Sequence, residues 1–392
     1  MANNKQIDAL LSRGVEEIIV EKELREKLAS GKKLRVKHGV DPTSKNLHIG
    51  HAVVYWKLKE FQDLGHTIVF LIGGFTARFG DPTDKEEARQ MRTKEEVEQE
   101  ADNYLNQVGK ILDLKKTEVR YNSEWYDKMS AEELLRIMSR FTVARMLERD
   151  MFQERMKKKL DIGLHEIVYP VLQGYDSVAL KDDLTVCGND QKFNELQARP
   201  LQKAYKQIPQ DIVTVPMLPG TDGRPMGQSL QNFISLADSA DEMFGKSMSI
   251  SDDLILSYFD LAARASNEKL DQVDAALAGG ENPRDVKLDL AEAITKLYHG
   301  DKEAKRAREE FLKIFAKKEK PTDIPEVSLE SGQLIDLVVN AKLASSKGEA
   351  RRLIEQGAVR FDDKVIKDWR AEVEVKKGMI MQVGKRKFVK IA

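Results

Sequence analysis

The stretch Leu34-Arg-Val-Lys-His-Gly-Val40, together with the residues that follow it, decides the fold. This short apolar segment is followed by a helix-like pattern over 50–64 and by a second apolar segment over 67–73. Short apolar segments that alternate with amphipathic ones are typical of a parallel β-sheet with crossover helices. The longest apolar run, 68–72, is far shorter than the ~20 residues of a membrane helix, so it indicates a buried strand. The sequence therefore predicts an open α/β sheet, whose ligands bind at the carboxyl ends of its strands.

The remaining pattern divides the chain into further parts. Strands are expected at 117–121, 185–187 and 212–217, and helices at 131–148 and 164–180. From Ser251 to Ala316 only helical periodicity remains, and the next residues hold two prolines and few apolar side chains, as linkers do. We therefore expect an α/β catalytic domain over 1–250, an α-helical subdomain over 251–316, a linker over 317–332 and a small domain over 333–392.

Composition excludes several classes of protein. The 392 residues are 41% hydrophobic and 33% charged with a net charge of -1, which excludes collagen-like, coiled-coil and disordered chains. A single cysteine, Cys187, forms no internal disulfide and builds no structural zinc site, which suits a reducing compartment. Because the first residues also lack the features of a signal peptide, we expect a cytoplasmic protein without a membrane partner.

Positive charge gathers in the last sixty residues, 333–392, which hold 14 Lys/Arg against 8 Asp/Glu. Within 346–355 the apolar residues follow a helical period and leave a basic face, and a hairpin is expected around Asp362-Asp363. Such a face suits phosphate groups, although a solvated helix surface remains the alternative. The candidate RNA-binding residues are Lys347, Arg351, Arg352, Lys385, Arg386 and Lys387.

Two histidines, His48 and His51, stand where the first strand passes into its helix, with Gly50 between them. At this spacing both imidazoles lie on one face of a helical turn, and a glycine lets a ligand approach the backbone. A helix N-terminus suits phosphate, whereas a metal pair and two incidental surface histidines are the alternatives. Metal is disfavoured because no nearby cluster completes a site, so no metal-binding residue is predicted.

The segment Asn46-Leu-His48-Ile-Gly-His51, preceded by Gly39-Val-Asp41-Pro-Thr43, resembles the first signature of class I aminoacyl-tRNA synthetases in its tyrosyl form. The likeness continues in order through 70–83, 121–125, 142–149, 169–176 and 190–194 into a tail similar to the ribosomal S4-like RNA-binding module. It implies a Rossmann-like parallel-sheet catalytic domain, an α-helical subdomain and a small α+β S4-like domain.

The resemblance also implies which residues bind the substrates. For ATP it implies Asp41, Thr43, His48, Gly50, His51, Gly188 and Asp190, and for tyrosine it implies Lys37, Gly39, Asp81, Tyr169, Gln173, Asp176 and Gln191. Asp81, Tyr169 and Gln173 would hold the ammonium, and Asp176 would accept a hydrogen bond from the phenol. This assignment is chemically sensible, because a buried phenol needs an acceptor and because positions i, i+4 and i+7 share one helix face.

The second signature of the family, Lys-Met-Ser-Lys-Ser, is altered in this chain. Its place is taken by Arg224-Pro-Met-Gly-Gln228-Ser229, which lacks both lysines. The loss of charged donors aimed at a departing phosphate can cost about 2.7–4 kcal/mol for each donor. Arg224 and Lys85 are the candidates to supply the charge, and together with His48, His51, Gln228 and Ser229 they form the predicted catalytic set. The segment 244–247 resembles a phosphate-binding loop, but Ala240 stands where such a loop needs glycine.

The resemblance implies a tyrosine–tRNA ligase that uses ATP with Mg²⁺ as a substrate complex, acts on tRNA(Tyr) and forms a homodimer. The altered signature supports an alternative, a synthetase-derived tyrosine-sensing or RNA-binding protein that has lost adenylation. A third possibility is a nucleotidyltransferase that acts on another small acid.

Overall fold

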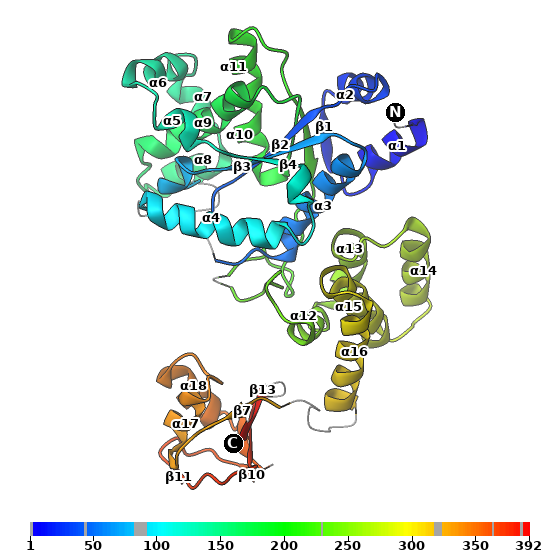
Figure 1. Cartoon of the computed structure of the whole chain (residues 1–392), viewed down its shortest axis with the longest axis vertical. Helices are drawn as coiled ribbons and strands as arrows, with labels where there is room; N and C mark the ends of the chain where they lie inside the picture. Colours follow the sequence, from blue (N-terminus) through cyan, green and yellow to red (C-terminus); the bar gives the residue numbers. More distant parts are fainter. Residues whose placement is uncertain are drawn as a thin grey trace. The chain divides into compact units, whose positions relative to one another are not determined.

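Two units make up the chain, Met1–Tyr298 and His299–Ala392 (Figure 1). The structure is a computed structural model, and it describes residues 3–42, 45–81, 92–228, 230–316, 324–362, 364–384 and 387–392. Each unit has its own hydrophobic core.

A six-stranded sheet forms the centre of the first unit. Its strands are β1 (Glu17–Ile19), β2 (Arg35–Val40), β3 (Thr67–Ile72), β4 (Thr117–Tyr121), β5 (Leu184–Gly188) and β6 (Asp211–Val215), in the order β1-β6-β5-β2-β3-β4. Strands β2 to β6 are parallel, which confirms the α/β prediction and all five expected strands. The sequence missed β1, which pairs antiparallel with β6, because this edge strand has only three residues and none is fully buried.

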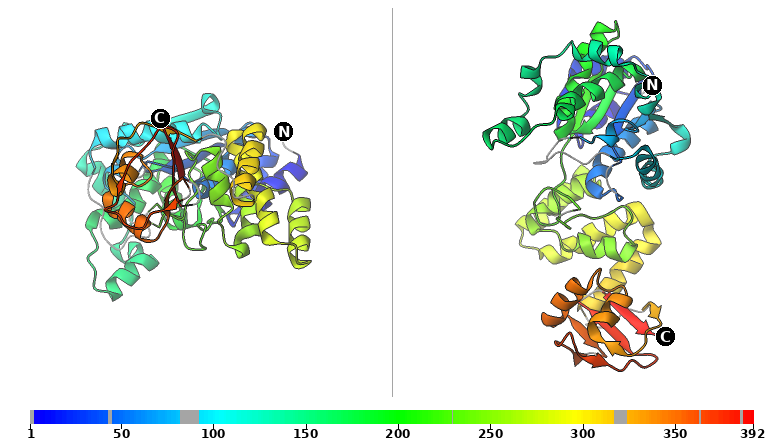
Figure 2. Two further views of the ribbon diagram at one scale, coloured as in Figure 1. Left: turned by 90° about the horizontal axis from the view of Figure 1, so that it is seen from below. Right: turned by 90° about the vertical axis from the view of Figure 1, so that its left-hand side faces the viewer.

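Helices cover both faces of this sheet (Figures 1 and 2). On β3, Ile68 and Phe70 belong to the core cluster that includes α3 (Ile49–Asp63), whereas Val69 and Leu71 pack with Leu180 of α9 (Leu164–Leu180). Alternate side chains of a strand point to opposite faces, so this strand is buried on both sides. Further helices of the α/β domain are α1 (Asn4–Ser12), α2 (Glu21–Ala29), α4 (Lys94–Val108), α10 (Lys192–Leu196) and α11 (Ala198–Ala204).

Four short helices lie between β4 and α9, namely α5 (Ser123–Tyr126), α6 (Ala131–Met138), α7 (Val143–Met146) and α8 (Asp150–Lys157). The expectation of one helix over 131–148 is therefore wrong. The chain ends α6 at Met138 and starts again where the Thr142 side chain accepts a hydrogen bond from the backbone N–H of Arg145. A threonine in this role favours a new helix start over continuation.

Residues 251–298, all of which the structure describes, are helical, as expected. They contain α13 (Ile255–Ser257), the π-helical turn η5 (Tyr258–Ala262), α14 (Asn267–Ala278) and most of α15 (Pro283–His299), and α12 (Ala240–Ser247) precedes them.

The second unit begins with α16 (Asp301–Ala316) and continues into a small α+β fold. Its helices α17 (Leu334–Asn340) and α18 (Lys347–Glu355) share a core with β9 (Val359–Phe361) and β12 (Ile380–Val383). The five-stranded sheet has the order β10-β9-β12-β13-β7, with β10 at Lys364–Val365, β13 at Lys387–Ile391 and β7 at Glu326–Val327. The expected hairpin is present as the antiparallel pair β9 and β10.

The described part of the expected linker, 324–332, contributes to this fold. Strand β7 pairs with β13, and β8 (Gly332–Gln333) pairs with β11 (Glu372–Val373). These residues are strands because their backbone groups find partners in the small domain, a relation that local composition does not reveal.

Candidate active site

The predicted tyrosine and ATP residues meet at the carboxyl ends of the parallel strands. The Tyr169 hydroxyl on α9 donates to Asp41 Oδ2 at 2.8 Å, directly after β2, and Thr76 Oγ1 donates to Asp41 Oδ1 at 2.8 Å. Gly73 is required here, because a Cβ at this residue would lie 1.8 Å from Asp41 Oδ1. Burial and the neighbouring Asp41 hold the pKa of Tyr169 well above its usual value, so its hydroxyl stays a donor. Gly73 and Thr76 were not among the residues predicted for this site.

Asp176 is a buried carboxylate with two fixed donors. It is 3% exposed and accepts hydrogen bonds from Trp125 Nε1 at 3.0 Å and Asn122 Nδ2 at 3.3 Å. Burial raises the pKa of Asp176 to about 7, although Lys37, Asn122 and Trp125 favour the ionised form. The carboxyl is therefore about half ionised near pH 7, and the ionised form, a hydrogen-bond acceptor, predominates as the pH rises above 7.

A chain of amides connects the other predicted tyrosine residues. Asn194 Nδ2 donates to Gln173 Oε1 at 2.9 Å and to Gln191 Oε1 at 3.1 Å. Gln191 Nε2 donates in turn to Asp81 Oδ2 at 2.9 Å and Asp190 Oδ2 at 2.8 Å. The structure thus brings the side chains of Gln173, Gln191, Asp81 and Asp190 together, and Asn194 is a connecting residue that the candidate set omitted.

Lys37 on β2 was predicted to bind tyrosine, but its ammonium is paired with other side chains of the protein. Its ammonium contacts Glu195 Oε2 at 2.7 Å and Ser177 Oγ at 2.6 Å, and the side chain is almost fully buried. Among the predicted glycines, Gly188 has a steric reason to be glycine, because a Cβ there would lie 2.4 Å from Asp190 Oδ1. A Cβ at Gly39 would make only an ordinary contact with Leu71, so the structure gives no steric reason for glycine there.

His48 and His51 stack at the start of α3, with ring centroids 3.7 Å apart and an interplanar angle of 30°. The backbone N–H of His48 donates to His51 Nδ1 at 3.2 Å, which leaves the His51 proton on Nε2. Burial lowers the pKa of His48 to about 4, and burial and His48 lower that of His51 well below its usual value. Both rings are therefore neutral at pH 7, and the buried His48 Nδ1 has no hydrogen-bond partner among the described residues.

Gly50 lets the altered second signature approach this turn, because a Cβ at Gly50 would lie 2.9 Å from His48 Nδ1 and 3.4 Å from Met226 Sδ. The described residues of 219–232 form what we term the signature loop. Gln228 Nε2 donates to the Asn46 carbonyl at 2.9 Å, two residues before His48. The loop therefore lies against the first signature.

Arg224 and Asn232 have different roles in the signature loop. Arg224 donates through Nε and Nη2 to Asp222 Oδ2 at 2.8 and 2.5 Å. Asn232, which is 4% exposed, accepts from the Gly227 N–H at 3.0 Å and donates to Asp222 Oδ1 at 2.8 Å and to the Pro225 carbonyl at 3.1 Å. The guanidinium predicted to replace a lysine is thus bound to a carboxylate. Three other predicted residues, Thr43, Lys85 and Ser229, lie outside the described residues.

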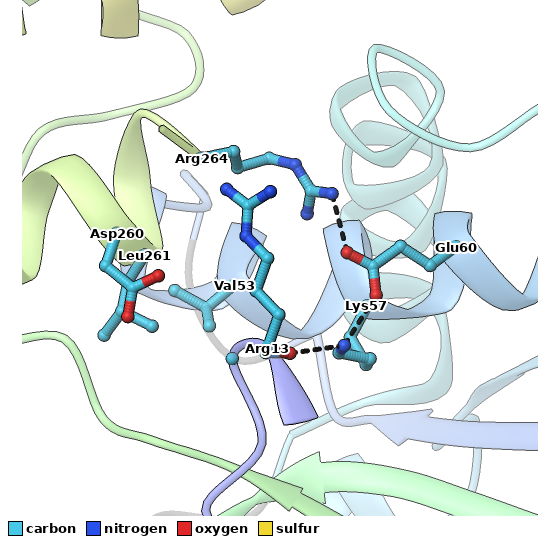
Figure 3. A pocket seen from close by; sticks show the side chains of 8 residues that line it. Arg13, Val53, Lys57, Glu60, Asp260, Leu261 and Arg264 are labelled. Atoms are coloured by element: carbon cyan, nitrogen blue, oxygen red, sulfur yellow. Dashed lines mark hydrogen bonds and ion pairs between the residues drawn. The ribbon is translucent and has the colours of Figure 1, made fainter. Parts of the chain in front are cut away.

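A small pocket lies away from all predicted site residues, between α1, α3 and η5 (Figure 3). Lys57 donates there to the Arg13 carbonyl and to Glu60, which also accepts from Arg264 (Figure 3). Lys57 donates as well to the Leu10 carbonyl. These bonds join the N-terminal helix to the helical subdomain, so we interpret this network as structural.

The predicted RNA-binding residues of α18 are partly paired on its surface. Lys347 contacts Asp336 at 2.6 Å, and Arg351 contacts Glu355 at 2.8 Å while its guanidinium lies 5.0 Å from the centre of the Trp369 ring. Arg352 is exposed on the same helix, and Lys387 Nζ donates to the Leu343 carbonyl at 3.0 Å. Lys385 and Arg386 lie outside the described residues.

Within the described parts of the chain, no helix is long and apolar enough to span a membrane. In the same residues, no group of three or more His, Cys, Asp or Glu side chains is arranged to hold a metal ion.

Known proteins resemble this chain over nearly its full length. The family model described as class I tRNA synthetases (W and Y) matches residues 29–316, and the model of the tyrosine–tRNA ligase SYY-like C-terminal domain matches residues 317–391. Proteins called tyrosine–tRNA ligase from Thermotoga maritima and Idiomarina loihiensis are each 46% identical over 98% of this chain, covering 96% and 97% of the relatives. This full-length likeness does not favour the tyrosine-sensing alternative.

Solved structures share the fold. The C-terminally truncated mitochondrial tyrosyl-tRNA synthetase of Aspergillus nidulans superposes with a TM-score of 0.66 at 21% identity, covering 80% of this chain and 95% of that one. Tyrosyl-tRNA synthetase from Archaeoglobus fulgidus, complexed with L-tyrosine, gives a TM-score of 0.63 at 22% identity, covering 78% and 99%. From the family models and the full-length relatives together, the chain belongs to the tyrosine–tRNA ligase family of class I aminoacyl-tRNA synthetases.

Proposed function

We propose that this protein activates tyrosine with ATP and transfers the tyrosyl group to the 3′ end of tRNA(Tyr). In the first step a tyrosine carboxylate oxygen attacks the α-phosphorus of ATP, and the bond to the leaving pyrophosphate breaks. The observation that carries this proposal is the buried Asp176 carboxylate on the same helix face as Tyr169 and Gln173. A carboxylate held by Trp125 and Asn122 at the closed end of a site suits a phenol hydroxyl.

The tyrosine ammonium is assigned to the opposite end of this face. Asp81 supplies a carboxylate, and the oxygens of Tyr169 and Gln173 supply neutral acceptors, which together match an ammonium with three donors. The Tyr169 hydroxyl uses its proton on Asp41, so its lone pairs are directed to other donors. Gly39 and Gln191 complete the proposed tyrosine site, whereas Lys37 is paired with Glu195.

ATP is assigned to the start of α3 and the segment after β5. Because His48 and His51 are neutral, they would donate hydrogen bonds to phosphate oxygens and would not act as charges. Asp41, Thr43, Gly50, Gly188 and Asp190 complete the proposed set. Mg²⁺ would enter as part of the substrate complex, because phosphate oxygens and water supply most of its ligands.

The lysine-free signature loop requires another source of positive charge for the leaving pyrophosphate. The ion pair with Asp222 makes Arg224 a weak candidate, so Lys85 is the stronger of the two predicted cations. Gln228 is proposed to hold the loop next to the first signature through its bond to Asn46.

We also propose a homodimer and a cytoplasmic location. Large apolar side chains are exposed on consecutive helices of the first unit, including Leu135 (63%), Val143 (62%) and Leu164 (80%). Exposed large apolar side chains are common at protein–protein interfaces, so these residues support an interface with a second copy. The single cysteine supports a reducing compartment.

The test is tyrosine-dependent exchange of labelled pyrophosphate into ATP, followed by tRNA charging. Parent protein should exchange with tyrosine, and Asp176→Ala should raise the tyrosine KM and erode selection against phenylalanine. Asp8→Ala, an exposed carboxylate on α1, is the matched control. Absence of exchange, with tyrosine binding retained, would instead favour the tyrosine-sensing protein.

A further inference from the structure

The buried ion pair between Lys37 and Glu195 is not part of the ligand contacts assigned above. Resting on the proposed tyrosine site, we infer that this pair positions Gln173 and Asp176 and thereby sets selection for the ammonium and phenol of tyrosine. Lys37 and Glu195 are positioning residues in this role, because they act through the two side chains that meet the substrate.

Glu195 fixes the orientation of the Gln173 amide. Its Oε1 accepts from Gln173 Nε2 at 2.8 Å, while its Oε2 accepts from Lys37 Nζ at 2.7 Å and Gln210 Nε2 at 3.0 Å. An amide whose NH₂ group is held by a carboxylate must present its oxygen on the other side. That oxygen receives Asn194 Nδ2 at 2.9 Å, on the side of Gln191, so the acceptor points into the proposed ammonium site.

Lys37 ties strand β2 to helix α9 beside the phenol acceptor. Its ammonium donates to Ser177 Oγ at 2.6 Å, and Ser177, which is fully buried, directly follows Asp176. The two side chains of the pair are 1% and 2% exposed, so solvent screens their charges weakly. The pair therefore connects Gln173, at the ammonium end of the tyrosine site, and the residue next to Asp176, at the phenol end, to strand β2.

The cost of burial argues against a purely structural pair. Removing two charges from water is expensive, and apolar residues of similar volume often stabilise a core as well or better. Burial alone would lower the pKa of Lys37, but Glu195, Asp182 and Asp176 outweigh it and raise that pKa, so the ammonium stays charged. A permanent cation beside Asp176 favours the ionised form of that carboxyl.

The charge state of Asp176 depends on groups from several elements. The titratable and charged groups that face it are Lys37 and Asp41 from β2 and its end, Tyr126 from α5 and Tyr169 from α9. The neutral donors Asn122 and Trp125 add two hydrogen bonds. Lys37 is the cation in this set, so its removal shifts the balance toward the protonated acid.

The two single variants should therefore behave differently with pH. Lys37→Met removes the cation. At pH 6 to 7 the tyrosine KM of this variant should therefore be roughly five- to tenfold above that of the parent, and the difference should disappear toward pH 8.5. Glu195→Gln leaves the cation and disturbs Gln173, so the tyrosine KM should rise by a factor that does not recover at high pH. The ATP KM should stay within about twofold of the parent in both, because the bonds described for Lys37 and Glu195 lead to Ser177, Gln173 and Gln210, none of which is assigned to ATP.

A double variant and a matched control keep the inference falsifiable. Lys37→Met/Glu195→Gln removes both charges of the pair, so that neither stays buried without the other, and Lys27→Met/Asp211→Asn removes a 2.7 Å ion pair at the amino end of β6. We expect the first double variant to raise the tyrosine KM and move its pH profile upward, and the control to match the parent. Parent-like tyrosine KM and pH profile in the first double variant, even with lowered thermal stability, would overturn the inference.

Equilibrium dialysis with labelled tyrosine repeats the comparison without catalysis. If the parent failed in pyrophosphate exchange, the ligase proposal would fall while dialysis still decided the inference. Weakened, pH-shifted tyrosine binding in Lys37→Met supports the positioning role, and unchanged binding refutes it.

Discussion

Asn232 should matter more to the adenylation step than Arg224, although the sequence points to Arg224. The buried Asn232 side chain joins three parts of the signature loop, and Gly220 makes room for it, since a Cβ there would lie 2.2 Å from Asn232 Nδ2. Among the described residues, the Arg224 side chain contacts one exposed carboxylate, that of Asp222. The substitution Asn232→Ala therefore releases the loop, whereas Arg224→Ala removes a surface ion pair.

The magnitude follows from the two backbone hydrogen bonds that Asn232 makes, to the Gly227 N–H and the Pro225 carbonyl. Each bond contributes about 0.5–1.5 kcal/mol, so the loss of both costs about 1–3 kcal/mol. This lowers the ratio of ordered to disordered loop by about 5- to 150-fold. Arg224→Ala should change activity by less than about threefold, because exposed ion pairs contribute little.

The assay is pyrophosphate exchange with kcat and the ATP KM measured separately, together with hydrogen exchange of the loop amides. Asn232→Ala should lower kcat/KM for ATP and speed amide exchange in the loop, with the tyrosine KM unchanged. An equal or larger loss of kcat in Arg224→Ala, with loop amide exchange unchanged, would refute the reasoning and restore Arg224 as the charge that replaces a lysine.

Three further outcomes are expected. Because burial raises the pKa of Asp176 to about 7 and the phenol needs the ionised acceptor, the tyrosine KM should rise about tenfold per unit as pH falls below 7, with the ATP KM flat over the same range. The variant Arg351→Ala/Arg352→Ala should raise the tRNA KM and reduce the salt slope of tRNA binding by about one to two, and equal pyrophosphate exchange separates this from a folding defect. Leu164→Asp should shift the protein toward monomer in sedimentation, and the exposed Val365→Asp is its control; a Leu164→Asp dimer would exclude that surface.

The regular helices and strands could be predicted because the periodicity of their own apolar residues is enough to identify them. Apolar runs gave all five parallel strands, and periodicity gave α9 with its observed bounds, Leu164–Leu180. The failures depend on distant partners. Strand β1 exists because β6 offers it an edge, and β7 and β8 exist because β13 and β11 pair with them.

The same distinction holds in the candidate site. Spacing placed Tyr169, Gln173 and Asp176 on one helix face, whereas the bond from Tyr169 to Asp41 was not predicted. Asn122 and Trp125 were missed as partners of Asp176, because a donor's role is set by what the fold brings opposite to it. Local sequence determines on which face of its own element a side chain lies, and not which side chain it meets.

One signal in the sequence could have led further. Lys37 lies inside the predicted strand 34–40, next to Val36, and its side chain is buried. A buried ammonium must have an acid partner or lose its charge, so this lysine requires a buried carboxylate from elsewhere in the chain. Glu195 satisfies that requirement, from a segment just after the predicted strand at 185–187. A charged residue at a core position therefore predicts a long-range contact, and here that contact lies beneath the tyrosine site.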